Sequence, residues 1–227
     1  MSNSDSVPPS VNRVRDRKPV SLRDAAYQEI KRRIITCEYA PGECINEAAV
    51  SSALGFGRTP VHQALDRLML EEMVEVIPRK GVIIKPIVMQ DVLELIEVRK
   101  VNEVHCARLA AQYANNAQIA ELASVVEAAQ NAVGRRDINA LMTLDGQFHN
   151  LLAEITRNFE LAEVVKRLNE RSLRFWFISF TTPTHHSDFQ RQHERIFLAV
   201  RNHDADEAEA AMQEHIESFR RSVARQL

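Results

Sequence analysis

Four residues in the second half of the chain have side chains that could bind a metal ion: Asp145, His149, His193 and His215. Asp145 and His149 are four positions apart, so on a helix they lie on one face, together with apolar neighbours. His193 and His215 lie among apolar residues on two later segments with helical periodicity. Burying an unpaired carboxylate costs roughly several kcal/mol, so a core that collects a carboxylate and three imidazoles requires a cation. The sequence therefore predicts a buried divalent metal site.

The donor atoms of this site narrow the identity of the metal but do not determine it. Three ring nitrogens and one carboxylate oxygen suit zinc, with nickel, cobalt and manganese as alternatives, because geometry and supply decide among these ions. Each histidine taken alone could instead be a hydrogen-bonded core residue, which is the commoner role of a single buried imidazole. The four residues together favour the metal.

A second group of polar residues suggests contact with nucleic acid. They occupy the first turns of a helix that is predicted to start after Gly57: Arg58, Thr59, His62 and Gln63. Apolar residues recur at i, i+4 and i+7 on the other side of that helix, so one face packs and the other is free to contact DNA. Two β-rich runs follow, residues 74–77 and 82–85, joined by a tight turn that contains Lys80 and Gly81. A helix followed by a basic β wing predicts a DNA-reading unit.

The elements that position these two groups divide the chain near residue 86. Ser21 is expected to cap a first helix, and Asn46 a short second helix that ends at Gly55. The first helix carries a basic triplet that includes Arg33, which either contacts the DNA backbone or is a solvated face. Residues 21–86 are therefore predicted to form a winged helix-turn-helix of three helices and a small β wing.

Residues 87–227 show only helical periodicity. The predicted helices are 89–114, 117–134, 137–156, 158–180, 187–202 and 204–225. Because the connections are short and no motif repeats at a fixed period, a compact antiparallel bundle of about six helices is expected. The whole protein is thus predicted to be mainly α.

Charge is divided unevenly between these two parts of the chain. The 227 residues carry a formal net charge of -2, but residues 1–86 contain 13 Lys and Arg against 11 Asp and Glu, and residues 87–227 contain 16 against 20. A basic excess confined to the front fits a DNA reader joined to an acidic second domain.

Composition also bears on the cellular compartment. The three cysteines have neither metal-site nor disulfide-framework spacing, and no apolar run approaches the length of a membrane span. Residues 1–20 are polar and lack the apolar segment of a secretory signal, so a flexible tail is predicted. We expect a cytoplasmic protein without membrane contact.

The reading unit carries a motif that resembles a known family. Residues 57–65, GRTPVHQAL, resemble the S-R-T-P-V-R-E-A-L signature of GntR-type bacterial transcription regulators. Gly57 stands where that signature has serine, and His62 where it has arginine. The resemblance implies a homodimer that binds a palindromic operator in double-stranded DNA.

The predicted metal ligands resemble the C-terminal FCD domain of the FadR subfamily of these regulators. That domain supplies an Asp and a His four residues apart, then two later His on separate helices, a pattern that Asp145, His149, His193 and His215 match. The resemblance implies that the metal lies in an effector cavity where small organic acids bind. Arg99 is similar to an arginine that the family places near the effector carboxylate, although an ion pair between Arg99 and Glu103 is the alternative.

Three functions are compatible with these features. The first is a ligand-responsive transcription regulator, a repressor, that senses a small carboxylate such as a sugar acid, lactate, a dicarboxylate or an aromatic acid. The second is a metal-dependent enzyme that uses the Asp/His site, although no additional buried base or nucleophile is apparent. The third is a DNA-binding protein whose metal is purely structural.

Overall fold

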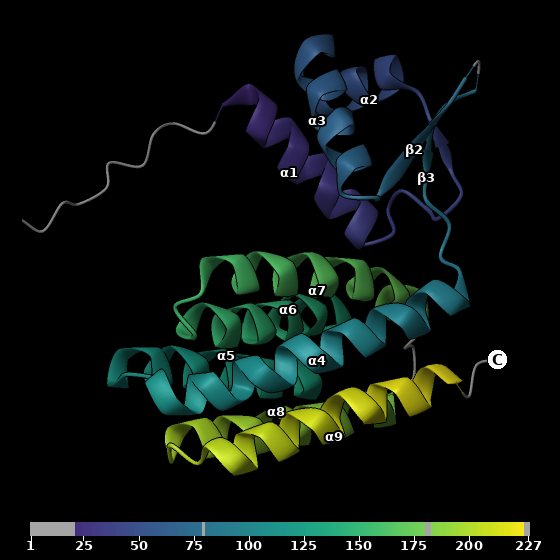
Figure 1. Cartoon of the computed structure of the whole chain (residues 1–227). Coiled ribbons are helices and arrows are strands. Elements are labelled where there is room, and N and C mark those ends of the chain that lie inside the picture. Colours follow the sequence, from purple (N-terminus) through teal and green to yellow (C-terminus); the bar gives the residue numbers. More distant parts are fainter. Residues whose placement is uncertain (1–20, 79, 180–182, 225–227) are drawn as a thin grey trace, which may run out of the picture.

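The computed structural model describes residues 21–78, 80–179 and 183–224, which form a small N-terminal unit above a helical bundle (Figure 1). The predicted tail, residues 1–20, lies outside the described residues. Within the described part there are nine helices and three strands: α1 (Leu22–Ile35), β1 (Cys44–Ile45), α2 (Glu47–Leu54), α3 (Arg58–Leu70), β2 (Val74–Ile77), β3 (Gly81–Ile84), α4 (Met89–Tyr113), α5 (Asn116–Arg135), α6 (Ile138–Ile155), α7 (Phe159–Ser179), α8 (Pro183–Arg201) and α9 (Ala205–Ala224). The predicted fold class is confirmed.

The N-terminal unit, which we call the head, has helix ends that follow from its capping residues. The side chain of Ser21 accepts a hydrogen bond from the backbone amide of Asp24 and so caps α1. The side chain of Asn46 accepts from the backbone amides two and three residues later and caps α2. Gly55 ends α2 in the left-handed conformation, with φ of 71°. These three caps were predicted and are confirmed.

The wing is a three-stranded antiparallel sheet with strand order β1-β3-β2. The sequence prediction contained no β1, because two residues are too short to show a strand period. Strand β3 begins at Gly81, one residue earlier than predicted. Gly81 has φ of 108°, and a Cβ there would lie 3.2 Å from the carbonyl oxygen of Ile45, so the turn requires glycine.

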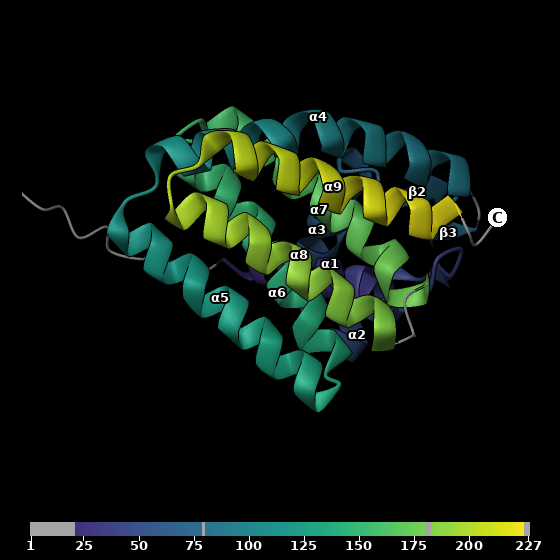
Figure 2. The same cartoon turned by 90° about the horizontal axis from the view of Figure 1, so that it is seen from below.

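The six bundle helices, α4 to α9, enclose a separate hydrophobic core. Helix α6 packs on α4, α5 and α7, while α4 packs along α9 and α8 lies beside α9 (Figure 2). The predicted bounds of these helices agree to within one residue except at α8, which starts at Pro183 rather than at residue 187. Proline is favoured in the first turn of a helix, where its missing N–H leaves no hydrogen bond unmade.

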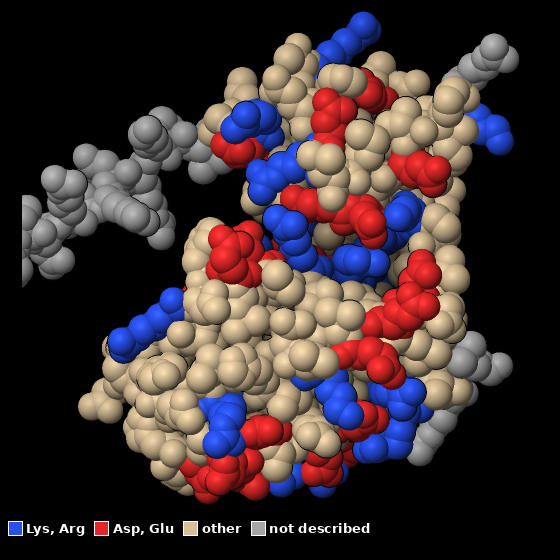
Figure 3. All heavy atoms as spheres, viewed as in Figure 1, with Lys and Arg blue, Asp and Glu red and all other residues tan. Residues whose placement is uncertain are grey.

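Charged side chains gather where the head meets the bundle (Figure 3). Lys31 of α1 is buried, and its Nζ lies 2.7 Å from Oε2 of Glu71 in the head and 2.5 Å from Oε2 of Glu170 in α7. Burial alone would lower the pKa of Lys31, but its hydrogen bonds to Glu170 and Glu71 raise it. The Lys31 ammonium therefore stays charged, and its ion pairs connect the head to the bundle.

We expect Lys31→Met to lower the free energy of unfolding by roughly 3 kcal/mol, because the Glu170 carboxylate would lose the cation that it pairs with and Glu71 would keep Arg67 as its cation. Urea denaturation at constant pH measures the change. Lys80→Met, at the exposed tip of the wing, is the control and should stay within about 0.5 kcal/mol of the parent. Equal stability of the Lys31 variant and the parent would contradict this role of the ion pairs.

Candidate metal centre and DNA-contact surface

The bundle brings the four predicted metal ligands together from three helices. Asp145 and His149 lie on α6, His193 on α8 and His215 on α9, with one ligand atom of each within 4.8 Å of all the others. The Nε2 atom of His215 is 3.3 Å from the Nε2 atoms of both His193 and His149. The Oδ1 atom of Asp145 is 3.5 Å from Nε2 of His193 and 3.9 Å from Nε2 of His149.

These separations fit four donors around one ion. Ligand atoms placed about 2.0–2.1 Å from a tetrahedral zinc ion are about 3.3 Å from one another. Two of the nitrogen–nitrogen distances equal that value, and the two oxygen–nitrogen distances exceed it by a few tenths of an ångström. The site can therefore hold a zinc-sized cation with small adjustments of the Asp145 carboxylate.

Polar partners lie on the outer side of two imidazoles. Nδ1 of His149 lies 2.5 Å from Oε2 of Glu103, and Nδ1 of His215 lies 3.0 Å from Oε1 of Gln192. The amide oxygen of Gln192 can only accept a hydrogen bond, so Nδ1 of His215 donates to it and the neutral His215 ring presents a lone pair on Nε2. The Nε2 atoms of His149 and His215 face each other at 3.3 Å, a separation at which both can bind one cation.

Burial of the ligands changes their pKa values. It lowers the pKa values of His193 and His215 well below the usual value for histidine, and His149 lowers both further. It also raises the pKa of Asp145. Neutral imidazole is the form that binds metal, so the two histidines are held in their ligand form at neutral pH.

Arg99 and Glu103 form the ion pair that the sequence offered as an alternative. Nε of Arg99 donates to Oε1 of Glu103 at 2.6 Å, and both side chains are about 97% buried or more. Although burial alone would raise the pKa of Glu103, the Arg99 guanidinium and the His149 ring lower it to about 2. Arg99 thus contacts the site through Glu103, and its charge also acts to lower the pKa values of Asp145, His193 and His215.

Two residues that orient the ligands were missed by sequence reasoning. Glu103 was considered only as a partner of Arg99, and Gln192 was not considered at all. For Glu103 a signal existed: it is an acidic residue on the same helical face as Arg99 and apolar neighbours, which indicates burial. For Gln192 there was none, because its contact with His215 joins two different helices.

A small cavity of about 30 Å³ adjoins the candidate metal centre. Its walls include Asp145, His193, Trp176 and Phe189, and Arg99 is not among them. This volume holds about one water molecule. A small organic acid can enter only if the surrounding side chains move apart, and contact between Arg99 and an effector stays a prediction.

The predicted DNA-contact residues of α3 are all exposed in its first turns. Among the described residues Arg58 has no ion pair, so its guanidinium is available to a ligand. His62 differs, since Nδ1 lies 3.0 Å from Oε1 of Glu47 and Nε2 lies 3.6 Å from Oδ2 of Asp66. The hydrogen bond with Glu47 raises the pKa of His62, which favours a charged ring.

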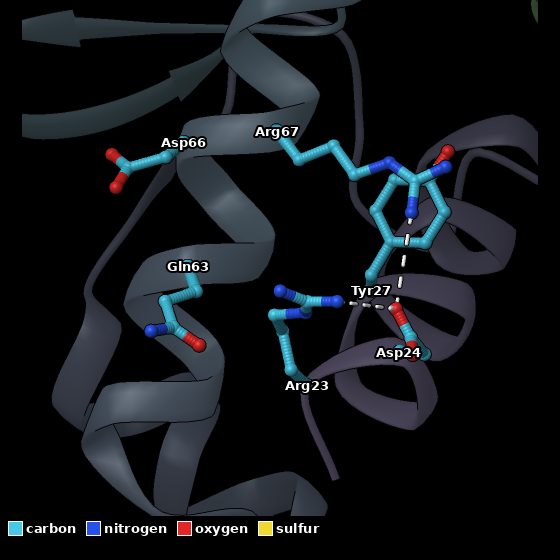
Figure 4. Close-up of a pocket in the computed structure, with 6 residues that line it drawn as sticks. All are labelled: Arg23, Asp24, Tyr27, Gln63, Asp66 and Arg67. Atoms are coloured by element: carbon cyan, nitrogen blue, oxygen red, sulfur yellow. Dashed lines mark ion pairs between the residues drawn. The ribbon is translucent and has the colours of Figure 1, made fainter. Parts of the chain in front are cut away.

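A groove of about 380 Å³ separates the contact face of α3 from α1. Gln63 extends into it from α3 and Arg23 faces it from α1 (Figure 4). In its wall the Arg67 guanidinium lies 3.7 Å from the centre of the Tyr27 ring, a cation–π contact between α3 and α1. Arg23 is a second exposed cation beside the first turns of α3 that sequence reasoning missed.

The remaining predicted DNA contacts lie in two different places. Lys80 and Gly81 are exposed at the tip of the wing. Arg33 lies in the last turn of α1, with Nε 2.8 Å from Oε1 of Glu29. Helix α1 ends beside the bundle whereas α3 begins at the far end of the head (Figure 1), so the structure does not bring Arg33 to the first turn of α3. A DNA contact by Arg33 stays a prediction.

Comparison with known proteins identifies both units. Residues 22–84 match the model described as "Bacterial regulatory proteins, gntR family", and residues 94–218 match the "FCD domain". The HTH-type transcriptional repressor RspR of Escherichia coli K12 is 29% identical over 198 residues, which are 87% of this chain and 86% of the relative. The Nta operon transcriptional regulator of Aminobacter aminovorans is 29% identical over 185 residues, 81% of this chain and 85% of the relative.

Solved structures support the fold. E. coli McbR/YncC superimposes with a TM-score of 0.83 at 19% identity, covering 92% of this chain and 99% of that one. A GntR regulator from Rhodococcus sp. RHA1 gives 0.77 at 18% identity, covering 89% and 97%. In the part of the chain that the structure describes, no helix is long and apolar enough to span a membrane.

We expect Gln192→Ala to weaken zinc binding about tenfold, because His215 would lose the acceptor that fixes its tautomer and orientation. Competition titration against a chelating indicator measures the affinity. Gln147→Ala, at an exposed position of α6, removes the same side chain without touching a ligand and should bind zinc as the parent does. Unchanged affinity in the Gln192 variant would mean that this amide does not orient His215.

Proposed function

The chain belongs to the gntR family of bacterial regulatory proteins and carries an FCD domain, and on that basis we propose that it is a repressor that responds to a small carboxylate. It is a DNA-binding transcription regulator, as its relatives are, and the alternative of a metal-dependent enzyme is set aside for that reason. In the proposal a homodimer binds a palindromic operator, and a divalent metal held by Asp145, His149, His193 and His215 lies where the effector is sensed.

The observation that carries the metal part of this proposal is the pair of opposed Nε2 atoms on His149 and His215. They are 3.3 Å apart, and the other nitrogen of each ring lies against Glu103 or Gln192, so both Nε2 atoms face the same point in the core. When bound, the metal supplies a positive centre in an apolar core, and the protein supplies the four donors. Zinc fits the observed spacing, and nickel, cobalt and manganese share the donor set.

Charge is the reason for proposing an acid as the effector. A divalent ion with one carboxylate ligand and three neutral imidazoles leaves a net positive charge, which a second carboxylate would neutralise. Arg99 contributes little to that charge, because Glu103 balances it. The small volume beside Asp145 and His193 further means that an acid must widen the cavity as it binds.

The exposed basic residues of the head are the basis for proposing how the protein contacts DNA. Arg58 and Lys80 are exposed on α3 and at the wing tip, and neither has an ion pair among the described residues. An arginine at the start of a recognition helix can contact guanine with two hydrogen bonds, whereas a lysine on a wing contacts phosphate. A two-fold palindromic operator then calls for a second copy of the chain. The relative RspR is named a repressor, which supports the same direction of control here.

A metal with a purely structural role is the second candidate. It is favoured by the small size of the adjoining cavity, since about 30 Å³ leaves no room for an acid without rearrangement. An acid that changes operator binding separates this candidate from the proposal.

We expect Arg58→Ala to weaken operator binding by roughly 1–3 kcal/mol and to relax its sequence preference. Lys80→Ala should instead weaken binding to all sequences and make the salt dependence shallower. Gel shifts with the operator, with mutated operators and at several salt concentrations measure both effects. Arg221→Ala, at an exposed position of α9, is the control and should bind as the parent does. Parent-like binding by both head variants would mean that α3 and the wing do not read DNA.

We expect small carboxylic acids to raise the melting temperature of the zinc-loaded protein, while their amides and methyl esters do not. A ligand that binds only the native state shifts unfolding by mass action, and the neutral analogues lack the charge that the metal attracts. Differential scanning fluorimetry on acid–amide pairs provides the measurement. Equal stabilisation by acids and by their amides would contradict the proposal that the effector is an anion.

His215→Ala should lose most of its metal and its effector response while keeping much of its operator binding, since the head has a core of its own. Its stability should fall, because Asp145 then lies buried beside His149 and His193 without a cation. Metal analysis measures the metal content, and gel shifts with and without effector measure operator binding and the effector response. His105→Ala, at an exposed position of α4, is the matched control. Full metal occupancy and a normal response in the His215 variant would remove this site from the mechanism.

A further inference from the structure

A second and larger cavity lies between the head and the bundle. It has a volume of about 510 Å³ and is formed by the connection between the two units, the start of α4 and one side of α7. Its walls contain three basic residues, Lys85, Arg171 and Arg174. We call it the interdomain cleft. It shares no lining residue with the cavity beside the candidate metal centre.

Arg174 is the unusual residue of this cleft. It is 5% exposed, and its guanidinium donates through Nη2 to the backbone carbonyl of Lys85. Its buried Nε has no hydrogen-bond acceptor, and no carboxylate of the described residues pairs with it. Burial lowers the pKa of Arg174 and the neighbouring Arg171 lowers it further, opposed only by Cys37. Arg99, which is also buried in the bundle, has Glu103 as its counter-ion.

The acidic residues around the cleft do not supply the missing charge. Glu72 is 57% exposed and lies 3.9 Å from Nζ of Lys85 and 3.5 Å from Nη1 of Arg171, so it is shared between those two cations. Asp91 and Glu94 are exposed to solvent, which screens their charges. Among the residues that the structure describes, the buried positive charge of Arg174 is thus left without a carboxylate partner.

The start of α4 adds a second feature that attracts anions. This helix of 25 residues has Val88 at its N-cap, and no side chain caps its first amides. Val88, Asp91 and Val92 line the cleft, so the positive end of the helix dipole lies at its wall. The buried Arg174 guanidinium, which has no carboxylate partner among the described residues, and the uncapped start of α4, whose first turn also holds the exposed Asp91, therefore border the same space.

We propose that the interdomain cleft binds a small oxyanion, a carboxylate or a phosphate, between Arg174 and the first turn of α4. This site is separate from the metal centre and does not depend on it. Because Lys85 and Pro86 of the connection form part of the wall, the bound anion contacts the joint between head and bundle. Its binding favours one orientation of the head relative to the bundle.

Inorganic phosphate and succinate are the probes, each compared with chloride at constant ionic strength and pH. We expect phosphate to raise the melting temperature by a few degrees once it exceeds its Kd about 100-fold. Calorimetric titration of the folded protein gives that Kd. The stronger of the two probes identifies the source of the oxyanion, and the absence of a response to either overturns the proposal.

Variants locate the site. Arg174→Met should raise the Kd for the stronger probe at least tenfold, and Arg167→Met, an exposed arginine of the same helix outside the cleft, should leave it unchanged. His215→Ala should keep the anion response, because the metal centre is not involved. Loss of the response in His215→Ala, or its persistence in a folded Arg174→Met protein, would overturn the proposal.

If Arg174→Met does not fold, a second substitution tests whether the interdomain cleft binds the anion. Arg171 is 37% exposed and lies beside Arg174, so Arg171→Gln should fold and still lose part of the anion affinity. An anion affinity equal to that of the parent in Arg171→Gln would exclude the cleft as the binding site.

Discussion

The packing of the bundle depends on the convergence of three imidazoles and one carboxylate in an apolar core. Helices α6, α8 and α9 each contribute to the cluster, so the distances among His149, His193 and His215 restrict how these helices cross. Glu103 of α4 contacts His149, and Gln192 of α8 contacts His215, so these contacts also restrict the position of α4 and add a second link between α8 and α9. Four of the six bundle helices are therefore linked by polar contacts whose loss would leave buried groups unpaired.

Features with a local cause could be predicted from the sequence. Ser21, Asn46 and Gly55 mark helix ends because a cap involves only neighbouring backbone groups. The spacing of Asp145 and His149 likewise places both on one face of a single helix. Their meeting with ligands on α8 and α9 was predicted from the cost of burying a carboxylate among apolar residues, and the resemblance of the whole pattern to a known domain supported it.

Features that arise from long-range contacts could not be predicted. Strand β1 exists only because β3 lies beside it, and two residues carry no period. The basic triplet of α1 was treated as one unit, but successive residues of a helix point in directions about 100° apart. Lys31 is consequently buried against Glu71 and Glu170, whereas Arg32 is exposed. Such burial is decided by α7, which lies more than a hundred residues further along the chain.

Pairing of β3 on both sides has a mechanical consequence for the head. Strand β1 follows α1 after a short turn and holds the inner edge of the wing, so the wing cannot swing as a separate hairpin. The head contacts the bundle where α1 packs on α7. A small rotation of the head about that contact would displace the wing tip by an amount that grows with its distance from the contact. In the proposed dimer two such heads must match half-sites about 34 Å apart, so a slight tilt is enough to lose the register with the DNA.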